Sequence, residues 1–262
     1  MYNFDFVKPA TVDEAVKALG DEDAQALGGG QTLIPTLKQR LASPSKLVSL
    51  TGISDMQGVT KDGDSVVIGG GTTHRVVAED AADAYPGLAG LAGRIGDPAV
   101  RNRGTIGGSL ANNDPSACYP AAALGSGATI VTNTREIAAD DYFQGMFTTA
   151  LEEGEIITQV RFPIPKVSHY SKIAQPASRF PLVAVFVAQY AGGVRVAVTG
   201  ASNNGVFRWS EAEAALSQNF AADALEGLTL PADDMIGDLH GTAAYRAHLV
   251  GVMTRRAVTA AS

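Results

Sequence analysis

The sequence predicts an α+β protein built in two parts. Three features indicate this: a strand that runs into three glycines and then a helix at residues 25–41, further strands and helices up to Pro163, and an apolar hairpin followed by two helices. The turn-like residues 163–167 separate the two parts. We therefore expect a larger glycine-loop part, followed by a smaller part made of an antiparallel sheet with helices.

The first residues predict a strand and a capped helix. Residues 2–7 form a short strand candidate, and Thr11 and Glu14 have the spacing of a capping box. Apolar residues after Thr11 fall on one helical face, and Gly20 follows the last of them. A helix is therefore expected over residues 11–19.

The glycine segment is expected to lead directly from a strand into a second helix. The strand is brief, at residues 25–27, and Thr32 is placed to cap a helix whose apolar positions include Leu33, Leu37 and Leu41. Each glycine inside an element costs roughly 1 kcal/mol relative to alanine. Either the chain turns tightly here, or something approaches its bare backbone.

The remaining elements follow from composition and period. Residues 95–109 contain too many Gly, Pro and Asn residues for a regular element. The strands expected elsewhere are 46–50, 65–70, 155–163 and the two arms of a hairpin at 181–201, and the helices are 72–80, 85–95, 209–217 and 245–258.

Composition and charge narrow the class of protein. The 262 residues are 45% hydrophobic and 18% charged, with a formal net charge of −7, which argues against a nucleic-acid or anionic-membrane surface. No apolar run is long enough to span a bilayer, and the start lacks the pattern of a signal peptide, so we expect a cytoplasmic protein. The single cysteine, Cys118, cannot build a disulfide or an iron–sulfur cluster within this chain.

Two glycine-rich segments carry the functional signal. "GGGQT" (28–32) and "GTIGGSLANNDP" (104–115) each place glycines beside hydroxyl or amide side chains. Successive backbone N–H groups in such turns form a nest for anions, and a following helix N-terminus adds partial positive charge. Two such segments suit a diphosphate, with the hydroxyl and amide side chains as further donors.

The common nucleotide-binding signatures do not occur. G-x-G-x-x-G would need a glycine three residues after Gly30 or Gly71, where Leu33 and His74 stand. No P-loop motif is found either. The expected ligand is therefore a dinucleotide bound by some other fold.

The two motifs in this order resemble a known family. "GGGQTLIPTLKQRL" followed by "GDPAVRNRGTIGGSLANNDPSACYPAAALGSGATIV" resembles the FAD-binding medium subunit of molybdenum hydroxylases, which includes the carbon monoxide dehydrogenase medium chain and the xanthine dehydrogenase flavin domain. The resemblance extends over nearly the whole chain, up to "YRAHLVGVMTRRAV". It implies an FAD-binding domain of the vanillyl-alcohol oxidase type at residues 1–165, with subdomains of about 1–52 and 53–165, and a C-terminal domain at 166–262.

The resemblance also implies a set of FAD contacts. One side of the diphosphate would meet the first glycine segment, the other side the second, and the isoalloxazine ring would lie near two further residues. These residues are Gly28, Gly29, Gly30, Gln31, Thr32 and Leu33; Thr105, Gly107, Gly108 and Ser109; and Ile157 and Lys172 at the ring.

Two positions depart from the family pattern. Where many relatives have an aspartate that bonds the adenosine ribose, the closest match by spacing is Cys118, and Asp114 is the nearby alternative. After Arg179, relatives often have a charged residue, whereas this chain has Phe180 and Pro181. The outer edge of the flavin would then be lined differently.

Several other residues have two interpretations each. His74 could donate a proton, or simply begin a helix; Cys118 could be a nucleophile, or a small buried thiol. Arg101 and Arg103 could reach phosphate or tie the loop to its own carbonyls. Asp97, before a proline, is most simply a turn residue.

By resemblance, the protein is the flavin subunit of a molybdenum hydroxylase. Non-covalent FAD would receive electrons from [2Fe–2S] clusters of a small partner subunit, fed by the molybdenum cofactor of a large one, and pass them to an external acceptor. The resemblance implies a dimer of heterotrimers. Two alternatives are a stand-alone flavin oxidoreductase of the same fold and a structural subunit that has lost flavin binding.

Overall fold

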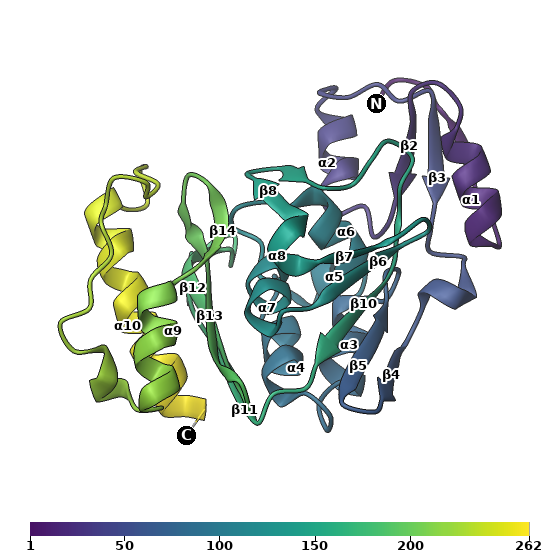
Figure 1. Ribbon diagram of the computed structural model, residues 1–262. Helices are drawn as coiled ribbons and strands as arrows, with labels where there is room; N and C mark the ends of the chain where they lie inside the picture. Colours follow the sequence, from purple (N-terminus) through teal and green to yellow (C-terminus); the bar gives the residue numbers. More distant parts are fainter. Residues whose placement is uncertain (262) are drawn as a thin grey trace.

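Two β-sheets lie on either side of a central layer of helices in the computed structural model, which describes residues 1–261. Figure 1 shows α4 (Pro86–Gly93) and α7 (Tyr119–Ser126) between a five-stranded and a four-stranded sheet. Helices α9 (Ser210–Gln218) and α10 (Ala243–Ala261) cover the outer face of the four-stranded sheet. The predicted α+β class is therefore confirmed.

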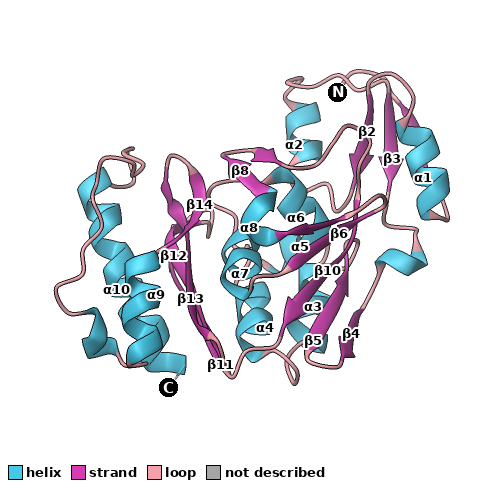
Figure 2. Ribbon diagram, viewed as in Figure 1, coloured by secondary structure: helices cyan, strands magenta, loops and turns pink. Residues whose placement is uncertain are grey.

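Within each sheet the neighbouring strands are either all parallel or all antiparallel. Figure 2 colours the strands and the helices differently. A parallel sheet has the order β1-β3-β2, an antiparallel sheet the order β4-β5-β10-β6-β7, and a second antiparallel sheet the order β11-β12-β13-β14. The strands are β1 (Asp5–Val7), β2 (Ala24–Leu27), β3 (Lys46–Ser49), β4 (Val59–Asp62), β5 (Ser65–Gly69), β6 (Thr129–Thr132), β7 (Glu136–Ala138), β10 (Ile157–Pro163), β11 (Val167–Ala174), β12 (Pro181–Tyr190), β13 (Gly193–Ser202), β14 (Gly205–Arg208), and the small hairpin β8 (Phe143–Gly145) with β9 (Thr148–Thr149).

The remaining helices are short and connect these sheets. They are α1 (Val12–Leu19), α2 (Leu33–Lys38), α3 (His74–Asp80), α5 (Pro98–Arg101), α6 (Ile106–Asn112), α8 (Ala139–Tyr142), and the 3₁₀ turns η1 (Ser54–Met56) and η2 (Ala222–Leu225). Both helices expected after β14 and the hairpin joined at Gly192–Gly193 are confirmed.

The N-terminal helix begins where its cap predicts. The Thr11 hydroxyl accepts a hydrogen bond from the Glu14 N–H at 3.2 Å, and the Glu14 carboxylate accepts one from the Ala10 N–H at 2.8 Å. The carboxylate thus closes the box one residue earlier than the Thr11 N–H. Ala15 and Leu19 bury the apolar face of the helix, as expected.

Helix α2 differs from the prediction at both ends. Thr32 stands at the N-cap position, but its backbone is already helical (φ −101°, ψ −51°), and its side chain makes no capping bond. The helix ends at Lys38, and Leu41 lies beyond it with 73% of its surface exposed. The Thr32 side chain therefore does not cap the N–H groups at the start of α2, although the sequence predicted that it would.

The prediction of an irregular stretch at 95–109 was wrong in part, because two capped helices begin there. Asp97 accepts a hydrogen bond from the Val100 N–H at 2.9 Å at the start of α5, so it is a helix cap as well as a turn residue. The Thr105 hydroxyl accepts from the Gly108 N–H at 3.2 Å at the start of α6. Local capping outweighs the low helix propensity of the glycines.

The four-stranded sheet is buried on both faces. Along β12, Val183, Val185 and Val187 pack toward α9 and α10, whereas Ala184 and Phe186 belong to the cluster that contains α4 and α7. One hydrophobic core therefore extends across residue 165. The division into domains at 1–165 and 166–262 stays a prediction.

A buried arginine fastens α10 to this sheet. The Arg246 guanidinium, in a residue only 2% exposed, donates to the carbonyls of Leu182 at 2.6 Å and Gly200 at 2.7 Å, and to both oxygens of Asp238. The two carbonyls belong to strands β12 and β13, and Asp238 lies in the loop before α10. The loop before α10 is thus tied to β12 and β13.

We predict that Arg246→Met lowers the free energy of unfolding by about 3 kcal/mol, because buried acceptors lose their donor. Denaturant unfolding followed by circular dichroism measures the change. The matched control is Arg256→Met on the exposed face of the same helix, where a change within about 0.5 kcal/mol is expected. Equal losses in both variants would contradict this account.

Candidate functional site

A cavity of about 650 Å³ brings the two glycine segments together. Its size is in the usual range for cofactor sites. Of the residues expected to contact FAD, all except Lys172 line it. These are Gly28, Gly29, Gly30, Gln31, Thr32, Leu33, Thr105, Gly107, Gly108, Ser109, Asp114 and Ile157.

The first glycine segment offers a run of free backbone donors. Between Gly28 and Leu33, no backbone N–H donates a hydrogen bond to any of residues 1–261; the first to do so is the Ile34 N–H, which bonds the Gly30 carbonyl at 3.1 Å. Backbone donors in folded proteins are almost always paired. Six consecutive free N–H groups at a cavity wall therefore fit an anionic ligand.

The glycines of this segment are required by neighbouring protein backbone. A Cβ on Gly29 would overlap the carbonyl oxygen of Arg103 and lie 2.6 Å from the Cα of Gly104. A Cβ on Gly28 would lie 2.9 Å from the Thr105 hydroxyl oxygen. The close approach expected from the sequence is thus between the two glycine segments themselves.

The second glycine segment does not form the expected nest of free N–H groups. The N–H groups of Ile106 and Gly107 donate to the carbonyls of Thr72 at 3.1 Å and Gly70 at 2.8 Å. Those of Gly108 and Ser109 donate to the hydroxyl and carbonyl of Thr105. What this segment offers the cavity is the hydroxyl hydrogens of Thr105 and Ser109, which no bond among residues 1–261 uses.

Asp114 and Cys118 both lie at the cavity, with different capacities. One carboxylate oxygen of Asp114 accepts a hydrogen bond from the Ser116 N–H at 2.8 Å, and the other can accept a further bond. Cys118 is buried, and burial raises the pKa of its thiol. Of the two, Asp114 has the carboxylate that can accept from a ribose hydroxyl.

Lys172 lies behind the wall of the cavity. Its ammonium donates to the carbonyls of Arg94 at 2.7 Å and Arg179 at 2.9 Å and approaches the Cys118 sulfur at 3.7 Å. Arg179 has φ +62° and lines the cavity with Phe180 and Pro181. Lys172 therefore holds cavity residues in place, because its own donors face protein carbonyls.

His74 lines the cavity, whereas Arg101 bonds carbonyls of its own loop. His74 begins α3 and is buried, and burial together with the nearby Arg101 charge lowers its pKa to about 4. It is therefore neutral near pH 7. The Arg101 guanidinium donates to the carbonyls of Ile95 at 3.0 Å and Gly96 at 3.1 Å, which ties the loop to itself.

The sequence reasoning missed a third glycine segment and, apart from Ile157, the wall of the site formed by residues 151–157. A Cβ on Gly70 would overlap the carbonyl of Ile157, and the Gly70 carbonyl accepts the bond from Gly107. The signal was present in the second "GGG", at residues 69–71. The wall formed by residues 151–157 carries no comparable motif.

Comparisons with known proteins agree with this geometry. The family described as the FAD binding domain in molybdopterin dehydrogenase matches residues 2–165. The carbon monoxide dehydrogenase medium chain of Afipia carboxidovorans is 35% identical, over 98% of this chain and 96% of that one. The nicotine 6-hydroxylase medium subunit of Paenarthrobacter nicotinovorans is 33% identical, over 98% and 96%.

A solved structure extends the agreement to three dimensions. A chain of the Cu,Mo-CO dehydrogenase in its cyanide-inactivated form has a TM-score of 0.88 and 34% identity, covering 100% of this chain and 98% of that one. The fold and the site thus define an oxidoreductase subunit of the flavin-binding class. The chain belongs to the family of FAD-binding domains in molybdopterin dehydrogenases.

Residues 1–261 contain neither a membrane-spanning helix nor a cluster of metal-binding side chains. None of their helices combines the length and apolar character that crossing a membrane requires. They contain no group of three or more His, Cys, Asp or Glu residues that could hold a metal ion.

We predict that Gly29→Ala destabilises the fold by about 3 kcal/mol, since the added methyl group must displace the Arg103 backbone. Denaturant unfolding is the measurement. The control is Gly90→Ala in α4, where the methyl group meets nothing within 4 Å and helix propensity favours alanine by up to about 1 kcal/mol. A Gly29→Ala protein as stable as the native chain would refute the contact.

Proposed function

We propose that this chain holds FAD non-covalently in the 650 Å³ cavity and works as the flavin subunit of a molybdenum-containing hydroxylase or dehydrogenase. The observation that carries the proposal is the run of free N–H groups from Gly28 to Leu33 at the cavity wall. Family membership and full-length similarity to medium chains support it.

Different residues of the chain would bind different parts of FAD. The N–H groups of the first glycine segment would hold the diphosphate, and the hydroxyls of Thr105 and Ser109 would donate to it from the other side. Asp114 would accept from ribose hydroxyls. Ile157 and Leu151 would exclude water from the flavin, and Lys172 would keep Arg179 and Cys118 in position.

Bound FAD would supply the redox chemistry, receiving electrons from [2Fe–2S] clusters in one partner and delivering them to an external acceptor. This chain has a single cysteine, so such clusters belong to another subunit. Its relatives are named as medium chains and subunits, which supports a large and a small partner. We propose that the assembly is a dimer of heterotrimers and that it works in the cytoplasm.

FAD uptake and reduction test the proposal directly. We expect the purified chain to bind added FAD and to show flavin absorption after gel filtration. The flavin should be reduced only when both partner subunits and a substrate of the large subunit are present. A folded chain that stays colourless after incubation with FAD would refute flavin binding, and reduction by substrate without partners would favour a stand-alone oxidoreductase.

Ser109→Ala tests one predicted contact without disturbing the fold. The Ser109 hydroxyl has no hydrogen bond to residues 1–261, so its removal should leave the melting temperature unchanged. We expect FAD affinity to fall about five- to tenfold, the usual effect of one lost hydrogen bond. Titration calorimetry measures it against Ser43→Ala on the exposed surface; equal affinities would remove Ser109 from the site.

A further inference from the structure

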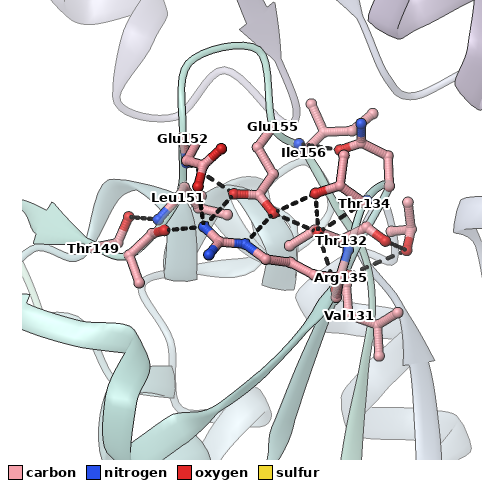
Figure 3. Close-up of polar contacts among 12 residues, drawn as sticks. Val131, Thr132, Thr134, Arg135, Thr149, Leu151, Glu152, Glu155 and Ile156 are labelled. Atoms are coloured by element: carbon pink, nitrogen blue, oxygen red, sulfur yellow. Dashed lines mark hydrogen bonds and ion pairs between the residues drawn. The ribbon is translucent and has the colours of Figure 1, made fainter.

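One wall of the cavity is a loop that is fastened from outside. Leu151, Glu155 and Ile156, in the connection from β9 to β10, line the cavity together with Ile157, the first residue of β10. Figure 3 shows hydrogen bonds and ion pairs between this loop and side chains from the turn between β6 and β7. The turn and the loop are about 20 residues apart in sequence.

The Glu155 carboxylate is the common acceptor of several of the hydrogen bonds that hold this loop. It accepts hydrogen bonds from the hydroxyls of Thr132 at 2.6 Å and Thr134 at 2.8 Å, and from the Glu152 N–H at 2.8 Å. Arg135 adds two more, from Nε and Nη2, each at 3.0 Å. The Glu155 side chain is only 3% exposed, so these donors replace the water that its carboxylate has lost.

The charge of Glu155 is fixed by this surrounding. The Arg135 guanidinium, helped by both threonine hydroxyls and the Glu152 N–H, lowers the pKa of Glu155 to about 2, although burial opposes the shift. Glu155 is therefore a carboxylate at any pH at which the protein works, and Arg135 lies against it as the compensating charge.

The same turn holds the loop at both ends. Arg135 Nη2 also donates to the Ala150 carbonyl at 2.6 Å, where the loop begins. Asn133 exchanges two hydrogen bonds with Ile156, where the loop ends: its side-chain oxygen accepts at 2.9 Å and its N–H donates at 3.1 Å. Between these points Glu152 and Glu153 are exposed, and the Glu152 carboxylate lies 3.3 Å from Arg135 Nη2, so Arg135 restrains the middle of the loop as well.

We propose that Arg135 and Glu155 form a clasp with two effects on the cofactor: it holds the 151–157 wall against bound FAD, and Arg135 cancels the buried Glu155 charge beside an electron acceptor. This inference rests on the proposed function. Both are positioning residues, since they act on the wall and on the local charge.

The two effects can be separated by substitution. Arg135→Gln opens the clasp and leaves an uncompensated carboxylate, so FAD should dissociate about tenfold faster and the flavin midpoint potential should become more negative. Glu155→Gln also opens the clasp but removes a negative charge and leaves Arg135 with only the exposed Glu152 carboxylate, 3.3 Å away, so dissociation should be faster while the potential becomes more positive. The double variant should release FAD quickly at nearly the native potential.

A matched ion pair serves as the control. Arg161 Nη2 and Glu136 Oε1 lie 2.6 Å apart on strands β10 and β7 of the same sheet, and neither residue lines the cavity. Arg161→Gln makes the same charge change and should alter neither FAD release nor potential. If Arg135→Gln does not fold, Arg135→Lys keeps the charge and loses the bridge to Ala150, so it should release FAD faster at an unchanged potential.

The experiment uses the full chain loaded with FAD, with release followed by flavin fluorescence, potential by dye equilibration, and folding by circular dichroism. Fast release together with opposite potential shifts in the two single variants supports the clasp. Variants with lower melting temperatures but native release and potential would overturn it and leave the proposed function intact. A native chain that takes up no FAD would overturn both, and is recognised because control and native proteins are equally colourless.

Discussion

The site depends on backbone meeting backbone without side chains between. At Gly29 the first glycine segment lies directly against the carbonyl of Arg103, and at Gly70 a second segment lies against the carbonyl of Ile157. The Gly70 carbonyl then accepts the N–H of Gly107, which fixes the start of α6. The three glycine segments, far apart in sequence, therefore pack together beneath the cavity. Their spacing is set by van der Waals contact between backbones rather than by flexible side chains.

This contact explains why the two glycine segments differ. Packing consumes the N–H groups at the start of α6, because carbonyls from residues 70 and 72 already occupy them. The glycines of the first segment pack against the protein, and the N–H groups of this cavity-lining segment bond none of residues 1–261. A chain with a net charge of −7 can thus offer an anion site whose donors are mainly backbone and hydroxyl groups.

Local signals in the sequence predicted a large part of the fold. Thr11 with Glu14, the break at Gly20 and the hairpin at Gly192–Gly193 each act within a few residues, and the structure confirms them. The helices begun by Asp97 and Thr105 were missed because their caps lie among glycines and asparagines that suggest a loop. Strands β8 and β9 are too short to have a period of their own.

The site was predictable where it follows the glycine motifs and unpredictable where tertiary contacts decide. Lys172 is placed by carbonyls of Arg94 and Arg179. Glu155 is placed mainly by side-chain donors 20 to 23 residues earlier, and no local pattern reveals these contacts. The family resemblance identified FAD as the expected cofactor. The orientation of each side chain, however, depends on neighbours from other elements.

Strand β13 of the four-stranded sheet supports the rim of the cavity. The Thr199 hydroxyl on β13 contacts the carbonyls of Pro115 at 2.9 Å and Ala117 at 2.8 Å, in the loop between Asp114 and Cys118. The family match ends at residue 165, yet the strand that steadies this rim comes after it. We therefore expect that the matched segment alone is not a self-sufficient flavin module: cutting the chain at its end would bare the apolar faces of α4 and α7 and leave the rim without its brace.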